Sequence, residues 1–335
     1  MRKRVTGLVL AMAMCVLMLT FVGCSASNEK SSNADEGTAA WPTKDVTIYV
    51  PAAAGGGTDI FTRMVADYLQ RTTGYTFTVI NMNAGGGMVA FERVRNSPAD
   101  GSVLMFWHIG MYVTYYSGTY GYNPKDDFTP LVMFEGLGDD GKQVFVVKSD
   151  SKWNSLSDVL NYAKANPNTV TYGCATGGSA QLVAEMLMQA ADAKLRLVDA
   201  SSQTDKIIGV AGGNIDMSAI THSAALQYVE SGDLKIIGVV DKEGTETYQS
   251  AYDQGYENCY WTQNLCVLGP PAMKESLAKA INEVFQGMLD DPETYALLES
   301  SKMLNSTMDY ADSLASFDDY DKLVGQASQQ IDWGN

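Results

Sequence analysis

Residues 45–71 read DVTIYVPAAAGGGTDIFTRMVADYLQR, and their pattern indicates the class of fold. In the first six residues polar and apolar side chains alternate, and β-branched residues are frequent, which predicts a strand. A loop of small residues follows over 51–57, and Thr58 and Asp59 then offer a helix N-cap. Apolar side chains recur at helical spacing as far as Arg71, which predicts a helix. The order is therefore strand, glycine-rich loop, helix.

Two further units repeat this order along the chain. Their expected elements are a strand over 77–81, a loop over 84–87 and a helix over 88–95, then a strand over 169–172, a loop over 173–179 and a helix over 180–191. The same patterns predict strands over 103–107, 143–147, 215–220 and 234–240, and helices over 156–165, 204–211, 223–230, 274–289 and 292–301, of which the last two close the chain. Alternating strands and helices predict an α/β fold with largely parallel sheets.

The length and composition are those of a globular protein with more than one core. Of the 335 residues, 46% are hydrophobic and 19% are charged, which is an ordinary globular balance. A chain of this length is too long for one typical core and suits two lobes.

The first residues have the pattern of an export signal. A basic segment at 2–4 precedes an almost unbroken apolar run over 7–22, which is too short and wrongly flanked for a transmembrane helix. The run ends in Gly23-Cys24, which resembles a bacterial lipobox, although Phe21 stands where a leucine is usual. We expect lipid on Cys24, which would anchor the protein to the outer face of the membrane. Ordinary signal cleavage with a free cysteine is the alternative.

The expected signal comprises residues 1–23, and a flexible tether follows over 24–40. Residues 25–40 read SASNEKSSNADEGTAA and contain no large apolar side chain. Because such a segment can bury nothing, we expect it to stay flexible. A tether between a lipid-bearing cysteine and a folded domain is what a lipoprotein needs.

Charge and cysteine content exclude some classes of function. The formal net charge is −16, and loss of the three basic residues of the signal would make it −19. Because phosphate contacts need clustered Lys and Arg, this charge argues against nucleic-acid binding. An exported protein can form a disulfide, and Cys259–Cys266 is the natural candidate, which the sequence leaves open. No Cys/His cluster has zinc spacing, so neither a metal site nor a cofactor is predicted.

The three glycine-rich loops are candidate anion sites. A helix N-terminus exposes unpaired N–H groups and carries about half a positive charge. Glycines just before it let a ligand approach the backbone, although tight strand–helix turns also need glycine. Three such loops opening into one cleft would suit a carboxylate ligand. The first loop lacks the Gly-Lys-Ser/Thr of a P-loop and the third glycine of a dinucleotide site.

Candidate catalytic residues are scarce. The chain has two histidines: His108 follows a strand and could border the cleft, and His222 opens a helix. Both positions are also common for structural histidines. Ser179 lies in a loop that lacks the last glycine of a hydrolase nucleophile elbow. Asp59 could bind a ligand amine or cap its helix, and the aromatic side chains over 107–116 could form a ligand wall or simply pack.

A set of motifs in a fixed order is more specific than any of these features. The motifs are Val50-Pro51 followed by GGGTD, NMNAGGG at 81–87, SPADG at 97–101, YNPKDDFTPLV at 122–132, LSDVLNYAKANPNTVTY at 156–172, the loop at 173–181, GGNID at 212–216, and Leu268 to Pro271 followed by a helix. From Trp41-Pro42 to the C-terminus, the chain resembles the extracytoplasmic receptors of tripartite tricarboxylate transporters, the Bug-type solute-binding proteins.

The resemblance implies a type II periplasmic-binding fold, in which ligand lies between two α/β lobes. Lobe 1 would comprise 41–142 and 262–335, and lobe 2 would comprise 143–261. Closure would trap a small carboxylate and present a surface to the membrane subunits of the transporter. Family members bind carboxylates through backbone N–H groups and ordered waters of the first loop and the second-lobe loop. Together with the residues singled out above and below, the candidate ligand-binding residues are Ala54, Gly56, Gly57, Thr58, Asp59, Gly86, His108, Ala175, Thr176, Gly178, Ser179 and Asp199.

One segment departs from the family pattern. Before the helix that leads to GGNID, the family usually has Val-Pro-Tyr-Lys-Gly, whereas this chain has VDASS at 198–202. An aromatic side chain and a base are missing, and the acid Asp199 is present. Asp199 could face a positive group of the ligand or only cap the helix. The shortage of bases near the loops favours anion binding by the backbone over binding by an arginine clamp.

These observations favour a binding protein over an enzyme. The expected function is capture of a small carboxylate and its delivery to a tripartite transporter. A ligand-sensing lipoprotein that partners a membrane signalling protein is the alternative. A hydrolase that uses Ser179 with His108 or His222 is the third hypothesis.

Overall fold

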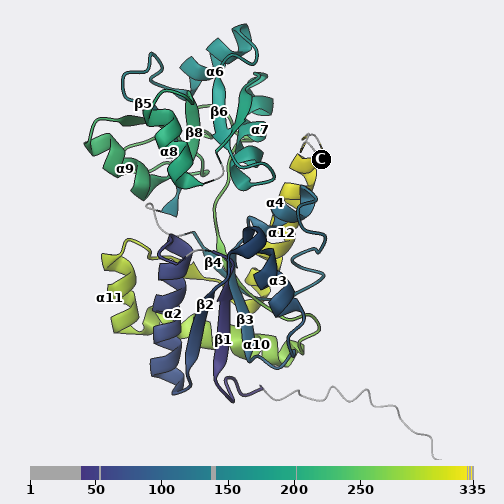
Figure 1. Cartoon of the computed structure of the whole chain (residues 1–335). Coiled ribbons are helices and arrows are strands. Elements are labelled where there is room, and N and C mark those ends of the chain that lie inside the picture. Colours follow the sequence, from purple (N-terminus) through teal and green to yellow (C-terminus); the bar gives the residue numbers. More distant parts are fainter. Residues whose placement is uncertain are drawn as a thin grey trace, which may run out of the picture. The chain divides into compact units, whose positions relative to one another are not determined.

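The computed structural model describes residues 39–335 except 53, 137–140, 201, 330, 332, 334 and 335. The expected signal, Cys24 and all but the last two residues of the expected tether lie outside the described residues. The described strands form two sheets, and helices pack on them (Figure 1). The expected α/β fold is confirmed.

The first sheet contains strands from both ends of the folded chain. In order across the sheet, these are β11 (Ser306–Thr307), β4 (Thr129–Glu135), β10 (Leu265–Gly269), β3 (Val103–His108), β1 (Val46–Val50) and β2 (Phe77–Asn81). β1 is parallel to β2 and β3. β10 is antiparallel to β3 and β4, and β11 is antiparallel to β4.

The second sheet is built from the middle of the chain. Its strands in order are β7 (Arg196–Asp199), β6 (Thr171–Cys174), β8 (Met217–Thr221), β5 (Gln143–Lys148) and β9 (Leu234–Val239). β6 is parallel to β7 and β8, whereas β5 is antiparallel to β8 and β9.

The prediction of largely parallel sheets is wrong, because both sheets are mixed. The chain leaves the first sheet after β4, enters the second with β5, and returns to the first with β10. β5 and β10 therefore arrive by a crossover between sheets rather than through a strand–helix–strand unit, and each is inserted antiparallel to both of its neighbours. Parallel neighbours need a crossover connection, usually a helix, and strands that enter from the other sheet are not bound to this arrangement.

Alternate side chains of the strands divide between two hydrophobic cores. Ile48 of β1 and Phe106 of β3 belong to a core that includes α2 (Gly57–Thr73) and α10 (Glu275–Gln286). Tyr49 of β1 and Met105 of β3 belong to the core on the opposite face. The helices of that face are α3 (Met88–Arg95), α4 (Met111–Tyr116) and α12 (Tyr310–Ser328). The period of two along a strand thus places helices on both faces.

The second sheet is covered in the same way. Phe145 and Val147 of β5 pack with α6 (Leu156–Ala165) and α7 (Ser179–Ala191). Val144 and Val146 pack with α8 (Gln203–Ala211) and α9 (His222–Glu230). β5 is buried on both faces, so it has no alternation of apolar and polar residues.

The C-terminal region differs from the prediction. The predicted helix over 274–289 ends at Gln286 and continues as a short 3₁₀ helix, η2 (Gly287–Asp290), before α11 (Pro292–Ser300). The last helix is α12, which the sequence reading missed together with α4. The buried side chains described in α12 are Ser313, Phe317 and Val324, and acidic residues lie between them in the sequence. Its helical periodicity is therefore weak.

The suggested Cys259–Cys266 disulfide is not present, since both residues and Cys174 are free thiols. Cys266 lies inside β10 between Trp107 of β3 and Met133 of β4. Cys259 instead lies under α7, with its Sγ 3.8 Å from the carbonyl oxygen of Val183. Short sequence separation did not bring the two sulfurs together.

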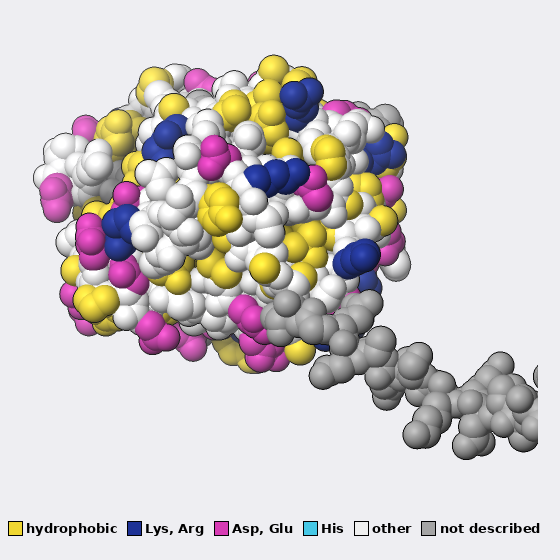
Figure 2. Space-filling view, turned by 90° about the horizontal axis from the view of Figure 1, so that it is seen from below, with side chains coloured by type: hydrophobic (Ala, Val, Ile, Leu, Met, Phe, Trp, Pro, Cys, Tyr) yellow, Lys and Arg dark blue, Asp and Glu magenta, His cyan; other side chains and the backbone are white. Residues whose placement is uncertain are grey.

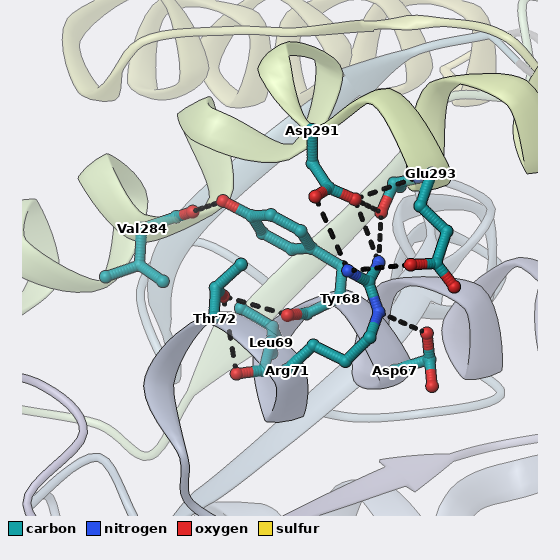
Figure 3. Close-up of polar contacts among 9 residues, drawn as sticks. Asp67, Tyr68, Leu69, Arg71, Thr72, Val284, Asp291 and Glu293 are labelled. Atoms are coloured by element: carbon teal, nitrogen blue, oxygen red, sulfur yellow. Dashed lines mark hydrogen bonds and ion pairs between the residues drawn. The ribbon is translucent and has the colours of Figure 1, made fainter.

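A cluster of polar contacts ties α2 to α11 (Figure 3). Arg71, in the last turn of α2, pairs with Asp291 (Nη2–Oδ2 2.8 Å) and with Asp67 (Nε–Oδ2 2.9 Å). Tyr68 donates to the carbonyl oxygen of Val284 at 2.9 Å. Helices far apart in sequence are thereby fixed beside each other on one face of the first sheet.

The surface carries mixed charge. On the face shown in Figure 2, Lys and Arg side chains lie scattered among acidic, apolar and neutral groups rather than gathered into a patch. Among the helices of the described residues, none is long and apolar enough to cross a membrane.

Candidate functional site

The loop between β1 and α2 is held by Asp59. The N-cap of α2 is Gly56, not Thr58 or Asp59 as predicted. The Asp59 carboxylate accepts hydrogen bonds from the backbone N–H of Gly55 (2.8 Å) and from Nδ2 of Asn81 (2.9 Å), and it pairs with Nε of Arg63 (3.0 Å). Its side chain is 4% exposed. Asp59 therefore supports the start of the helix and does not present its carboxylate to a ligand amine.

The charge on Asp59 is stabilised within the loop. Burial alone would raise the pKa of Asp59, but hydrogen bonds from Gly55, Arg63 and Asn81 outweigh burial and hold the pKa below its ordinary value. Gly55 has φ +86°, a left-handed conformation that favours glycine. The loop is thus fixed both by backbone geometry and by an ionised anchor.

The loop between β6 and α7 is built in the same way. Gly177 has φ +71°, Gly178 is the N-cap of α7, and the N–H of Gly177 donates to Oε1 of Gln181 at 2.8 Å. Gln181 lies four residues after Gly177, as Asp59 lies four residues after Gly55. Each loop therefore ends in a helix whose first N–H groups have no acceptor within the helix. The anchor of the first loop is an anion, and that of the second is neutral.

The first loop lines a pocket of about 580 Å³, whose other lining residues come from segments next to both sheets. Gly55, Gly56, Gly57 and Thr58 contribute one wall. The other described lining residues are Ile60, Gly141, Gln143, Gln203, Thr221, Ser223, Ala224, Gln227, Gln263, Ser301 and Met303. The side chains of these described lining residues are all neutral, and the amides and hydroxyls among them can both donate and accept hydrogen bonds.

The second loop contributes to a smaller pocket of about 290 Å³. Thr176 and Asp199 line it together with Cys174 and Gln181. Asp199 is exposed at the end of β7, where it lies in register with Cys174 of β6. The structure thus brings Asp199 beside the second loop.

The other predicted residues line neither of these two pockets. Those in the two loops are Ala54, Asp59, Ala175, Gly178 and Ser179, and those elsewhere are Gly86 and His108. The first and second loops line different pockets, and the third glycine segment lines neither. These two pockets therefore do not agree with the prediction that the three loops open into one cleft.

Gly86 and His108 have evident structural roles. Gly86 lies in η1 (Ala84–Gly87), a short 3₁₀ helix where a loop was predicted, and its φ of +67° favours glycine. Nδ1 of His108 accepts the backbone N–H of Gly110 at 3.1 Å, and its ring stacks on Trp107 at 4.0 Å. Burial lowers the pKa of His108 to about 4, so the ring is neutral at pH 7.

The aromatic residues over 107–116 mainly pack. Tyr112 is fully buried and donates to the carbonyl oxygen of Phe317, and Tyr116 donates to Asp321. Both contacts hold α4 against α12. These two tyrosines therefore pack within the fold rather than form a ligand wall.

The sequence reading missed the second wall of the larger pocket. Gln203 and Thr221 lie at the start of α8 and the end of β8, and the Thr221 N–H donates to Oε1 of Gln203 at 3.2 Å. Ligands of open α/β sheets bind beyond the carboxyl ends of strands. That rule, applied to the predicted strand over 215–220, was the signal that could have found these residues.

Comparison with known proteins identifies the family. Residues 61–329 match the family described as the tripartite tricarboxylate transporter family receptor. The chain belongs to this family. Family members and structural neighbours are solute-binding receptors and not enzymes, so this receptor is a solute-binding protein.

Curated relatives are similar to this receptor over most or part of their length. The UPF0065 protein in the TAR-I ttuE-ttuC' intergenic region of Agrobacterium vitis is 30% identical over 206 residues, which cover 60% of this chain and 58% of that protein. The protein BugT of Bordetella pertussis is 23% identical over 73% of this chain and 78% of its own.

Solved structures support the two-lobed fold. Rpa4515 of R. palustris with adipate has a TM-score of 0.71 at 20% identity, covering 87% of this chain and 99% of that one. MatC of Rhodopseudomonas palustris with bound malate has a TM-score of 0.69 at 18% identity, covering 86% and 100%. At these identities the likeness concerns the fold.

Proposed function

We propose that this receptor captures a small carboxylate between its two lobes and delivers it to the membrane subunits of a tripartite transporter. The observation that carries the proposal is the pair of loops built alike at the N-termini of α2 and α7. Helix N-termini preceded by glycine bind anions through backbone N–H groups. Structural neighbours with bound adipate and malate agree with a carboxylate ligand.

The proposed contacts come mainly from the backbone. In the first loop, Gly56, Gly57 and Thr58 offer N–H groups to a carboxylate in the larger pocket. In the second loop, residues 175–179 do the same, and Asp59 acts by holding the first loop in shape. The neutral amide and hydroxyl side chains of the larger pocket would orient the rest of the solute.

We propose lobe boundaries of 41–142 and 262–335 for lobe 1, and 143–261 for lobe 2. Strand membership supports them, since β5 to β9 form one sheet and the remaining strands form the other. Closure about the connections between the lobes would trap the solute and create the surface that the transporter reads. Export and a lipid on Cys24 would keep the receptor at the outer face of the membrane.

A thermal-shift screen with the full chain purified in detergent tests the proposal. The library contains mono-, di- and tricarboxylates, amino acids and aromatic acids, with sugars and amines as controls. A ligand of the folded state raises stability by about RT ln(1 + [L]/Kd). We expect a selective rise of the unfolding midpoint with one class of carboxylate, followed by calorimetric titration of the best acid. A cooperative transition that no acid shifts would contradict the proposal.

A further inference from the structure

Lys206 lies at the carboxyl end of β8, close to the larger pocket. It stands one turn after Gln203 on α8, and its Nζ donates to the carbonyl oxygen of Ala219 at 3.4 Å. Ala219 is two residues before Thr221 in β8, and both Gln203 and Thr221 line the larger pocket. Lys206 therefore lies next to the wall that the sequence reading missed.

Lys206 is also close to the smaller pocket. Burial raises the pKa of the Cys174 thiol to about 11, and the positive charge of Lys206 opposes part of that rise. Cys174 lines the smaller pocket with Thr176. Lys206 is not itself among the described lining residues of either pocket, but its ammonium group lies beside Ala219 and close to Cys174, at the edge of both.

Within the described residues, no carboxylate pairs with the Lys206 ammonium group. Its polar contact is the Ala219 carbonyl, whereas Lys44, Lys125 and Lys164 each lie within 4.0 Å of an aspartate. The neighbouring Asp205 completes the capping box of α8 with Ser202. Lys235 is also half-buried without an acidic partner among the described residues, but its Nζ has two acceptors at 2.7 Å, whereas the Nζ of Lys206 has one at 3.4 Å.

A half-buried ammonium group without a charged partner lowers the stability of the fold unless a ligand supplies hydrogen-bond acceptors for it. The group has three donors, and the Ala219 carbonyl engages one of them at a long distance. Burial lowers the pKa of Lys206, which reports the lost hydration of its charge. Transfer of a charge from water is unfavourable without a compensating partner. An anionic group of the solute would supply that partner.

We propose that Lys206 binds a second carboxylate of the solute, so that the receptor selects dicarboxylates over monocarboxylates. The proposal rests on the proposed function, in which the loop N–H groups bind the first carboxylate. Lys206 then determines specificity, because a monocarboxylate would leave its ammonium group unpaired. The described side chains of the larger pocket are neutral, so they cannot replace this charge.

Calorimetric titration of the full chain in detergent with acids matched in length tests the inference. The pairs are adipate with hexanoate and succinate with butyrate. We expect wild type to bind the better diacid at least about tenfold more tightly than its monoacid, because a hydrogen bond between charged groups can supply the corresponding difference of about 1.4 kcal/mol. Lys206→Met should remove this preference by weakening the diacid alone, and Lys206→Arg should keep most of it.

Lys194→Met is the matched control, because Lys194 is an exposed lysine just before β7, at the amino end of the parallel strands β6 and β7. It makes the same change of net charge and should leave both affinities within about twofold of wild type. Circular dichroism verifies folding of each variant. If Lys206→Met does not fold, Lys206→Gln takes its place.

The outcomes separate the two proposals. If no acid binds wild type, the proposed function fails and the inference fails with it. If a diacid binds wild type but the Lys206→Met or Lys206→Gln variant keeps the same ratio of diacid to monoacid affinity, the inference is overturned and the proposed function stands. An equal loss of both affinities would also overturn it, because it would show a structural role.

Discussion

At the scale of single residues, two anchors of different charge hold loops of the same shape. Asp59 and Gln181 each accept the N–H of a glycine in the left-handed region. The ionised anchor needs further donors, which Asn81 and Arg63 provide. In both loops the side chain fixes the backbone, and the backbone is left to meet the ligand.

Replacing Gly56 tests whether the loop backbone meets the solute. Gly56 has φ −80° and ψ 164°, which any residue can adopt, so Gly56→Val should fold. The new side chain would keep a carboxylate from the first N–H groups of α2, and we expect affinity to fall at least about tenfold in calorimetric titration. Gly121→Val is the control, since its Cβ would meet open space. Unchanged affinity in the Gly56 variant would refute the loop model.

His108 should make the fold sensitive to mild acid. Its folded pKa of about 4 lies below the value of about 6.5 in an unfolded chain. The unfolded state therefore gains a proton first as pH falls, so the stabilisation present above pH 6.5 is lost progressively toward pH 4. In His108→Asn, whose amide oxygen can still accept the Gly110 N–H, urea unfolding between these pH values should vary less. An identical pH profile in both proteins would contradict this role.

At the scale of elements, α2 and α11 are joined through their ends. Asp291 is the N-cap of α11 and accepts the Thr294 N–H at 2.9 Å, and the same carboxylate pairs with Arg71 of α2. Contacts with Arg71 and then Thr294 hold the pKa of Asp291 well below its ordinary value. One side chain therefore both starts a helix and fastens it to another.

Asp291→Ala should destabilise the fold, with loss of the cap alone costing about 1 kcal/mol. Because the folded pKa of Asp291 is lowered, its contribution is present above about pH 4 and is lost as pH falls further. The difference from wild type in urea unfolding should then be larger at pH 7 than at pH 3. Asp67→Ala removes another partner of the same arginine without removing a cap, and its effect should be smaller. Equal effects would show that the cap contributes little.

At the scale of the whole molecule, the two sheets share one hydrophobic core cluster. This cluster includes Met105 and Met133 of the first sheet, Phe145 and Val147 of the second, and Phe317 of α12. The larger pocket also takes residues from both sides of the fold. The proposed capture of a solute would therefore need the complete fold rather than either sheet alone.

The proposed membrane attachment also concerns the whole protein. If lipid on Cys24 anchors the receptor, Cys24→Ser should release it into the soluble fraction, since the acyl chains supply the membrane affinity. Cell fractionation followed by immunoblotting measures this. Ser25→Ala is the control, because it changes the next residue and keeps the cysteine, so this variant should remain in the membrane fraction. Retention of the serine variant on the membrane would show that another contact holds it there.

Local sequence patterns were enough to predict much of the fold. β2 and α6 were predicted over the residues where they occur, because periodicity of apolar side chains and Asn-Pro or glycine boundaries depend on near neighbours. The order of the three strand–loop–helix units was likewise readable, although the predicted loop at 84–87 is η1 and the strand predicted over 169–172 is β6 at Thr171–Cys174. The family and its two-lobed fold were readable from residues 41 to 335. Among the candidate site residues, Gly56, Gly57 and Thr58 were predicted in this way, and they line the larger pocket.

Tertiary contacts, and not local sequence, set the direction of β5 and β10, the inward position of Asp59 and the separate places of Cys259 and Cys266. They also decided that Gln203 and Thr221 face the first loop across the larger pocket, and that Lys206 has no acidic neighbour among the described residues. The physical reason is the same in each case. A helix or a turn is encoded by residues within a few positions, whereas strand insertion, burial of a charge and the wall of a pocket depend on contacts between residues distant in the chain.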